Sequence, residues 1–328
     1  RGRDDRVFPG SLEYQYNCNS AESVCLLYSC RMRLLLLTAR PELETNRRLE
    51  AAARAQGVEM VTVDAARVTA AVTPKPTLRI GFDDLLDAPI DAVLARVGNW
   101  RPDSVLAALE AAVAAGAATP NQPRAIRIGR DHWRTTHALA AAGLPVPATI
   151  AGGDPEELAG AAASLSFPVV VKQRRSRMGV GVIRCASRDH LESVLDSLWR
   201  VGDELIVQEF VPTDGRSLRL LVVGDRTVAA GLFVAPQGDW RSNAARGGSA
   251  EPYRASDAEQ ELARSAARAV GLGVCGVDLL PGAKTVVGEV NPTPGFRRLE
   301  EASGVDVAAA IIRHTAECAR PPRPGARG

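Results

Sequence analysis

Oxygen-bearing side chains gather near the C-terminal end of the sequence, in two apolar stretches that follow one another. Asp278 ends the first stretch, and Glu289 and Asn291 lie two residues apart in the second. Residues two apart on a strand face the same side, and a turn at 281–282 lets the stretches pair as a hairpin. Two carboxylates and an amide oxygen would then converge, which is a hard ligand set that suits Mg²⁺. The alternative, an acidic strand end that faces water, fits less well with strands that are otherwise apolar.

A second group of residues has the chemistry of a phosphate site. Lys172 closes an apolar strand and is followed by a loop rich in Arg, Ser and Gly that contains Gly179 and Gly181. Backbone amides of such a loop can surround phosphate oxygens, and the lysine adds a point charge. It is not a Walker loop, because G-K-[ST] is missing and the lysine precedes the glycines. Taken alone, this loop would more often be a plain hairpin.

Residues 208–211, Gln-Glu-Phe-Val, lie at the end of a predicted strand, just before Pro212. Backbone groups at such a strand end could bind the edge of an adenine, and an amphipathic strand end explains the same residues equally well. The segments 238–243 and 246–248 are too polar and too rich in glycine for a core. Their arginines could bind a phosphate or carboxylate through two hydrogen bonds each, and a solvated loop is the alternative.

Composition excludes several classes of protein. With 328 residues, 46% hydrophobic and 24% charged, the chain is typical of a soluble globular protein with two or three subdomains. A net charge of +2 gives no case for nucleic acid or membrane binding, and no apolar run reaches membrane-spanning length. Of the six cysteines, Cys18, Cys25 and Cys30 cluster, but they lack a C-x-x-C pair and a nearby histidine, which argues against zinc. We expect a reducing, cytoplasmic setting.

The first part of the chain alternates strands and helices. This order predicts a small open α/β domain from 32 to about 120, with a parallel sheet and a right-handed crossover. No G-x-G-x-x-G follows the first strand, so a dinucleotide site is not supported. The predicted elements are strands at 33–38, 58–63 and 92–97, and helices at 42–56 and 105–115.

The second part of the chain carries shorter strands between helices. Its Val-Gly-Asp at 223–225 predicts a tight hairpin turn, and Gly271 a helix end. At the two ends of the chain, we expect 1–31 to be an atypical extension that is disordered or not native, and the Pro- and Arg-rich tail 320–328 to be disordered. The predicted elements are strands at 167–172, 180–187, 205–211, 218–223 and 227–234, and helices at 131–142, 257–270 and 305–318.

Together and in this order, the motifs resemble the ATP-grasp superfamily and, within it, the RimK-type α-L-glutamate ligases. The resemblance runs from Met32 to about Glu317. It implies an α+β ATP-grasp fold, in which an N-terminal open parallel α/β domain at 32–122 precedes two ATP-grasp subdomains that clasp the nucleotide, a central lid at 123–207 and a C-terminal subdomain with the metal site at 208–319. The motifs that carry it are 96–98, 171–172, the loop up to Gly181, 208–211, 218–224, 239–243, 246–248, Asp278 and 289–291.

The resemblance assigns roles to the residues that match the family's motifs. Some of them would bind the phosphates and the adenine of the nucleotide, and others would line the substrate side. Two arginines would act in catalysis, and three residues would bind one or two Mg²⁺ ions, or Mn²⁺. The nucleotide-binding residues are Lys172, Gly179, Gly181, Gln208, Glu209, Phe210, Val211, Ser217, Arg241, Ser242 and Asn243, the catalytic ones Arg241 and Arg246, and the metal ligands Asp278, Glu289 and Asn291.

The implied activity is an ATP-dependent ligation of a carboxylate to an amine. A substrate carboxylate attacks the γ-phosphate, and an amine then displaces phosphate from the acyl phosphate to form an amide. The amine would be glutamate or a similar amino acid, and the acceptor a protein, a peptide or a small molecule. The family's habits imply a homodimer or homotetramer. The alternatives are a ligase that modifies a ribosomal peptide and a nucleotide-binding protein with little turnover.

The sequence departs from the family pattern at four places. All four concern residues expected to contact the nucleotide or the substrate, and none concerns the predicted metal ligands. His132 stands where the family usually has lysine. Ser217 replaces a common aspartate, with Asp214 as a possible substitute. Apolar residues occupy 232–234 in place of a charged stretch, and Ala245 replaces a common histidine.

Overall fold

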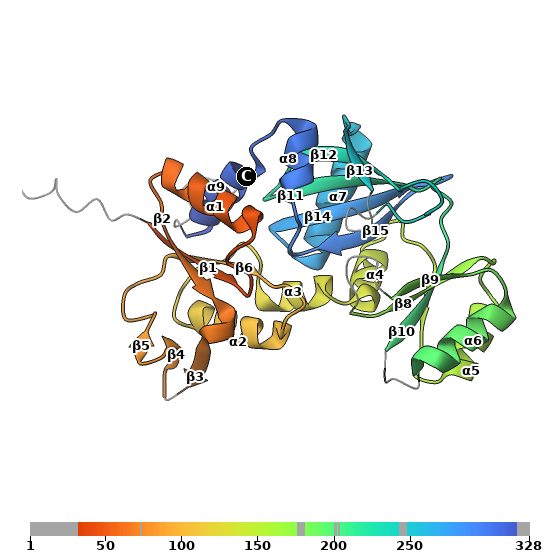
Figure 1. Cartoon of the computed structure of the whole chain (residues 1–328), viewed down its shortest axis with the longest axis horizontal. Helices are drawn as coiled ribbons and strands as arrows, with labels where there is room; N and C mark the ends of the chain where they lie inside the picture. The colour runs from red at the N-terminus through yellow and green to blue at the C-terminus, as the bar shows by residue number, and fades with distance from the viewer. Residues whose placement is uncertain are drawn as a thin grey trace, which may run out of the picture. The chain divides into compact units, whose positions relative to one another are not determined.

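The computed structural model describes residues 32–72, 74–175, 181–199, 202, 204–242 and 248–319 (Figure 1). These residues belong to one compact unit. The predicted end segments 1–31 and 320–328, with the cysteine cluster, lie outside the described residues, as do Gly179, Asn243 and Arg246. None of the helices among the described residues combines the length and the hydropathy of a membrane span.

The first sheet has three parallel strands in the order β2–β1–β6, as the alternation of strands and helices predicts. They are β1 (Arg33–Thr38), β2 (Glu59–Asp64) and β6 (Ala92–Arg96). The unbroken apolar run 34–37 is fully buried because helices cover both faces of the sheet. Its odd-numbered leucines join the core beneath α2 (Pro102–Ala114), and its even-numbered ones pack toward α1 (Glu44–Ala55) and α9 (Val307–Cys318).

A small antiparallel sheet interrupts this unit, and the sequence did not predict it. Its strands are β3 (Thr69–Val72), β4 (Pro76–Ile80) and β5 (Asp83–Asp84), preceded by the 3-10 turn η1 (Ala65–Arg67). The strands are too short and too polar to give a periodic signal.

The second sheet is antiparallel, in the order β7–β10–β8–β9. Helices α5 (Pro155–Ala162) and α6 (Arg188–Trp199) cover one of its faces. Since side chains alternate along a strand, Val169 and Val171 enter the core beneath these helices, and Lys172 faces the opposite side. The strands are β7 (Thr149–Ala151), β8 (Val169–Gln173), β9 (Val182–Cys185) and β10 (Leu205–Glu209).

The third sheet has five antiparallel strands, in the order β13–β12–β11–β14–β15. Helix α7 (Asp257–Val270) packs on one face, while α8 (Arg297–Ser303) and α9 pack on the other. Helix α7 begins at a capping box of Ser256 and Glu259 and ends at Gly271, whose φ is 83°. The predicted hairpins β11–β12 and β14–β15 are both confirmed. The strands are β11 (Arg216–Val223), β12 (Arg226–Val234), β13 (Ser249–Pro252), β14 (Val274–Pro281) and β15 (Thr285–Asn291).

Buried polar contacts tie the first sheet to the third. Helices α3 (Pro123–Gly129) and α4 (His132–Ala141) follow the first unit, and just before them Asn121 is 4% exposed. The Asn121 amide accepts from Val274 N at 2.9 Å and donates to Val274 O at 2.7 Å. Arg96, at the end of β6, donates to Pro294 O at 3.0 Å, in the loop that follows β15. The C-terminal edge of the first sheet is thereby held beside the end of the predicted metal strand.

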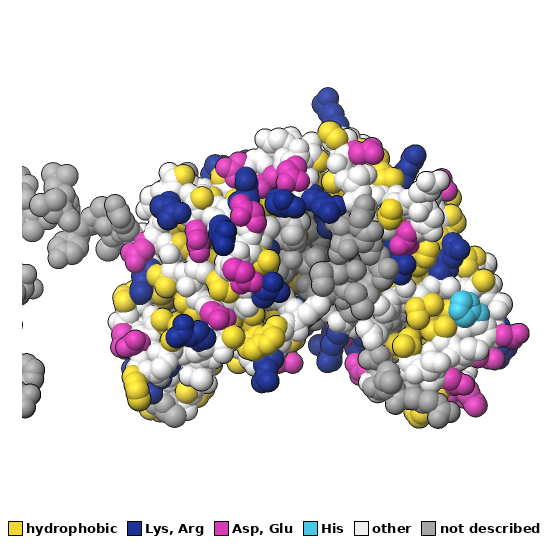
Figure 2. All heavy atoms as spheres, viewed as in Figure 1, with side chains coloured by type: hydrophobic (Ala, Val, Ile, Leu, Met, Phe, Trp, Pro, Cys, Tyr) yellow, Lys and Arg dark blue, Asp and Glu magenta, His cyan; other side chains and the backbone are white. Residues whose placement is uncertain are grey.

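On the face shown in Figure 2, basic and acidic side chains are intermixed, which accords with a net charge of +2.

Candidate functional site

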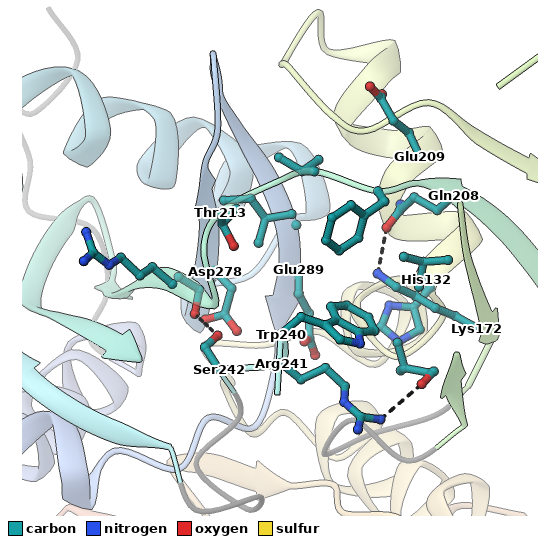
Figure 3. Close-up of a pocket in the computed structure, with 18 of the residues that line it drawn as sticks. His132, Lys172, Gln208, Glu209, Thr213, Trp240, Arg241, Ser242, Asp278 and Glu289 are labelled. Carbon is teal, nitrogen blue, oxygen red and sulfur yellow. Dashed lines mark hydrogen bonds between the residues drawn. The ribbon is translucent and has the colours of Figure 1, made fainter. Parts of the chain in front are cut away.

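A pocket lies between the second and third sheets, and most of the predicted site residues line it (Figure 3). Strands β8, β9 and β10 supply one wall, and strands β11, β14 and β15 with the segment after β12 supply the other. Gly181 and Asn291 are described but are not among the lining residues. The predicted residues that line the pocket are Lys172, Gln208, Glu209, Phe210, Val211, Ser217, Arg241, Ser242, Asp278 and Glu289.

The two acidic side chains lie directly opposite each other on paired strands. Asp278 of β14 is the register partner of Glu289 of β15, and the pairing shifts immediately after Asp278. Like charges in this arrangement repel, so a cation between or beside them stabilises the pair. In the structure Arg219 of β11 is that cation, because its Nε and Nη2 donate to the two Asp278 oxygens at 2.7 and 2.5 Å.

Arg219 itself is held from both sides. Its guanidinium lies 4.9 Å from the centre of the Phe233 ring, and its side chain is only 19% exposed. Burial alone lowers the pKa of Arg219, but the Asp278 and Glu289 carboxylates more than reverse this effect, so its pKa lies above the ordinary value. The arginine therefore stays charged and holds Asp278 in place. Phe233, which lies in the apolar segment 232–234, thus supplies an aromatic ring beneath Arg219.

Asn291 is placed next to the two carboxylates but is already engaged. It is the register partner of Gly276, and its Oδ1 accepts from Thr293 N at 2.9 Å. The predicted hairpin therefore brings Asp278 and Glu289 into the pocket, whereas Asn291 turns toward the loop that follows β15.

The donor set fits a hard divalent cation bound with a nucleotide. Among the described residues, no group of three or more His, Cys, Asp or Glu is arranged to hold a metal. Mg²⁺ commonly takes only one or two protein carboxylates and completes its shell with phosphate oxygens and water. Asp278 and Glu289 satisfy that requirement.

Lys172 faces the acidic pair across the pocket. Burial lowers the pKa of its ammonium, and the negative charge of Glu289 opposes that change. Its Nζ donates to Gln208 Oε1 at 2.7 Å, and Gln208 Nε2 in turn donates to Thr149 Oγ1 at 2.8 Å. Gln208 is 3% exposed, and its amide orients the lysine at the pocket wall.

The strand end after Gln208 is only partly available to a nucleotide. The backbone N–H of Glu209 donates to Ala148 O at 2.8 Å, and its side chain accepts from Ala148 N at 3.2 Å, which turns its carboxylate away from the pocket in Figure 3. Phe210 packs edge-on against Trp240, with ring centroids 5.5 Å apart. Together the two rings form an aromatic part of the pocket wall.

Arg241 and Ser242 are anchored near this wall. Arg241 Nε and Nη2 donate to the Asp239 carboxylate at 2.9 and 3.1 Å, and Nη1 donates to Val182 O of the opposite sheet at 3.3 Å. The arginine lowers the pKa of Asp239. Ser242 Oγ lies 2.6 Å from Ser217 Oγ. Asp214, the suggested substitute for the family aspartate, is exposed and does not line the pocket.

Several pocket residues lie outside the predicted site. Arg219 and Trp240 were within quoted motifs without a role, and His132 was noted only as a departure. A charged residue inside an apolar strand, as Arg219 is, was the available signal, since such a residue needs a partner on the neighbouring strand.

Comparison with known proteins shows that the chain belongs to the RimK-like ATP-grasp family. Residues 32–126 match the family model "RimK PreATP-grasp domain" and residues 129–315 match "RimK-like ATP-grasp domain". A protein of Thioalkalivibrio sulfidiphilus named "Probable alpha-L-glutamate ligase" is 36% identical over 301 residues, which is 90% of this chain and 99% of that protein.

Two solved structures share the fold. The ATP-grasp ligase PsnB with a minimal precursor has a TM-score of 0.69 at 21% identity, covering 88% of this chain and 99% of that one, and PsnB has also been solved with Mg and ADP. A RimK domain protein of Sphaerobacter thermophilus has a TM-score of 0.68 at 24% identity, covering 86% and 99%. The predicted resemblance and the predicted ATP-grasp fold are both confirmed.

Proposed function

Because the chain belongs to the RimK-like ATP-grasp family, we propose that it is an ATP- and Mg²⁺-dependent ligase that joins a carboxylate to an amine. The amine is glutamate or a similar amino acid, and the carboxylate belongs to a protein, a peptide or a small molecule. The observation that carries the proposal is the convergence of Lys172 with the opposed Asp278 and Glu289 in one pocket. The name shared by the curated relatives supports glutamate as the amine.

The proposed reaction has two steps that share the pocket. An oxygen of the substrate carboxylate attacks the γ-phosphorus of ATP, and ADP leaves with the electron pair of the broken bond. The amine nitrogen then attacks the acyl carbon, phosphate leaves, and the amine proton passes to solvent. Both steps depend on positioning and on neutralisation of charge, and neither requires a side-chain nucleophile.

Each pocket residue has a part in this scheme. Lys172, oriented by Gln208, would bind phosphate oxygens. Asp278 and Glu289 would hold Mg²⁺, whose chemistry is to neutralise the charge on the transferred phosphoryl oxygens. Since Asp278 accepts two hydrogen bonds from Arg219, the guanidinium must share or release this carboxylate when the metal binds. Arg241 and Ser242 lie where they could line the phosphate and substrate side.

We also propose a division of the chain that follows the sheets. The open α/β domain spans 32–122, and the central lid begins at 123. Strand β10 runs through Glu209 and pairs with β7 and β8. The division between the lid and the C-terminal subdomain therefore falls better after Glu209 than after 207, where the sequence placed it.

Trapping the acyl phosphate with hydroxylamine tests the proposed activity without knowledge of the amine. Purified protein is incubated with ATP, Mg²⁺, hydroxylamine and a panel of carboxylates that includes peptides with C-terminal glutamate. We expect a hydroxamate and an equal amount of ADP. Glu289→Gln should abolish both, whereas Glu251→Gln, which changes an exposed residue of β13, should leave them unchanged. Binding of ATP without ADP release with any carboxylate would favour a nucleotide-binding protein with little turnover.

A further inference from the structure

Arg96, the last residue of β6, is a desolvated cation without an acidic partner. Its Nη1 donates to Pro294 O at 3.0 Å, and its guanidinium lies 5.7 Å from the centre of the Phe296 ring. No carboxylate pairs with Arg96 in the part of the chain that the structure describes, and burial lowers its pKa to about 10. Arg219 shows the contrast, because its carboxylate partners raise its pKa above the ordinary value. A desolvated charge is costly unless an opposite charge accompanies it, so Arg96 lacks a partner that a ligand can supply.

The edge of the Arg96 guanidinium that suits a carboxylate is unused. Among the described residues, only Nη1 has a hydrogen-bond acceptor, whereas Nε and Nη2, whose N–H bonds run parallel, have none. This is the edge through which arginine binds a carboxylate with two hydrogen bonds. Arg96 is partly exposed, as is Gly98 two residues further on, where an added Cβ would meet nothing within 4 Å. The structure therefore leaves space for a ligand at the end of β6.

The end of β6 is also where the topology of the sheet predicts a ligand. From β1 the chain runs to β2 on one side and later to β6 on the other, and α1 and α2 cover opposite faces (Figure 1). In open parallel sheets, ligands bind outside the carboxyl ends of the two strands at which the order reverses in this way. Thr38 and Arg96, the last residues of β1 and β6, are register partners at that point.

The loops at these two strand ends have a defined form. After β1, Asn46 of α1 donates through Nδ2 to Thr38 Oγ1 at 3.2 Å. After β6, Arg101 has a φ of 34°, in the left-handed region that side chains disfavour, and its guanidinium lies 5.6 Å from the centre of the Trp100 ring. Trp100 is 42% exposed. Backbone strain of this kind is found mainly at functional sites, so the loop 97–101 is a second indication of a ligand at this edge.

Hydrogen bonds tie this edge to the strand that carries Glu289. The carbonyl that Arg96 binds belongs to Pro294, in the loop that follows β15, and Asn121 donates to Pro292 O of the same loop at 3.3 Å. A ligand held by Arg96 therefore lies beside the loop that leads out of the proposed metal strand. A ligase needs a substrate in this region, because the substrate must reach the phosphate that the metal holds.

We propose that Arg96 binds a carboxylate group of one ligase substrate through its Nε and Nη2 edge and so helps to select that substrate. The inference rests on the proposed function, because it is the proposed ligation that brings a carboxylate to this edge. The carboxylate belongs either to the glutamate that supplies the amine or to the end of the acceptor. Arg96 acts here in binding only and has no part in phosphoryl transfer.

Calorimetry of the protein saturated with Mg²⁺ and a non-hydrolysable ATP analogue tests the inference. The probes are glutamate and a short peptide that ends in glutamate, each compared with its amides, in which one carboxylate is replaced by a neutral group of the same shape. Arg96→Met removes the charge but keeps the stem, and Arg96→Lys keeps the charge but loses the paired N–H groups. Arg79→Met is the matched control, because Arg79 is an exposed arginine of β4 in the same α/β domain.

The wild type and Arg79→Met should bind one of the two probes at least about tenfold more tightly than one of its amides. Arg96→Met should bind that probe and its amide equally, with the Kd of the ATP analogue unchanged, and Arg96→Lys should retain part of the difference. The probe that loses its advantage over the amide identifies whether the carboxylate comes from the amino acid or from the acceptor. A general loss of packing would not erase this preference selectively.

Retention of the preference in Arg96→Met would overturn the inference and leave the ligase function standing. A wild type that binds the ATP analogue but distinguishes neither probe from its amides would do the same. Equal loss of affinity for every probe and for the ATP analogue in both Arg96 variants would also overturn it, because Arg96 would then act only by holding the loop at Pro294. Failure of the wild type to bind the ATP analogue would overturn the proposed function itself.

Discussion

Replacement of Arg219 by methionine should destabilise the fold and at the same time favour divalent cations at the acidic pair. Methionine retains most of the stem that packs on Phe233 but removes the guanidinium. Asp278 then loses two hydrogen bonds, at 2.7 and 2.5 Å, and faces Glu289 across the hairpin with no counter-charge from β11.

The size of the loss in the free energy of unfolding follows from the burial of the Arg219–Asp278 pair. The Arg219 and Asp278 side chains are 19% and 16% exposed, so little solvent screens the pair. Removal of one partner of such a pair costs about 3 kcal/mol of the free energy of unfolding. Arg226→Met is the control, because Arg226 pairs with Asp225 at 3.9 Å on an exposed turn, with side chains 84% and 93% exposed, and it should have little effect.

Urea unfolding with and without Mg²⁺ measures both effects. In Arg219→Met the Asp278 carboxylate no longer pairs with the guanidinium, so Mg²⁺ should stabilise the variant more than the wild type. At ten times Kd the gain is about 1.4 kcal/mol. The double variant Arg219→Met/Asp278→Asn should recover part of the loss, because the unpaired charge is gone, with a coupling energy of about 2 kcal/mol. Wild-type stability in Arg219→Met, together with an unchanged response to Mg²⁺, would show that Arg219 neither stabilises Asp278 nor competes with the cation.

Three further predictions concern single residues. Burial lowers the pKa of Lys172, so between that lowered value and about 10.4 the unfolded chain binds more protons than the folded chain. In this alkaline range the free energy of unfolding of the wild type should therefore rise with pH relative to that of Lys172→Met. Urea unfolding at several pH values would measure this. Gly273→Ala should cost at least about 2 kcal/mol of stability, because its Cβ would lie 2.6 Å from a backbone oxygen, whereas Gly295→Ala, with nothing within 4 Å, should be nearly neutral in the same assay. Trp240→Leu removes the edge-on contact with Phe210 and should raise the Kd for the nucleotide roughly fivefold, measured by calorimetry.

The parts of the structure that could be predicted depend on local pattern. The buried run 34–37 indicated a sheet covered on both faces, and the structure confirms it. The spacing of Glu289 from Asp278 across a Pro-Gly turn predicted their hairpin, and they lie opposite each other. In each case a short segment and its periodicity contain the whole signal.

The parts that could not be predicted depend on register between distant strands. Arg219 meets Asp278 because β11 pairs with β14, 59 residues further along the chain, and no local pattern reports that pairing. His132 reaches the pocket because α4 docks on the end of β8 through Asp131 and Arg174, which again joins distant segments. The Oδ1 of Asn291 accepts a hydrogen bond from Thr293 N in the loop after β15, which no local pattern reports, and its part in holding the metal stays a prediction.

A crystal structure with a non-hydrolysable ATP analogue and Mn²⁺ would show whether Asp278 and Glu289 hold the metal, because the anomalous signal of manganese locates the ion. We expect Mn²⁺ bound to Asp278, Glu289 and the phosphates, with the triphosphate against Lys172. Arg219 should then share or release the Asp278 carboxylate. Nucleotide or metal bound elsewhere, with the Arg219–Asp278 pair intact, would contradict it.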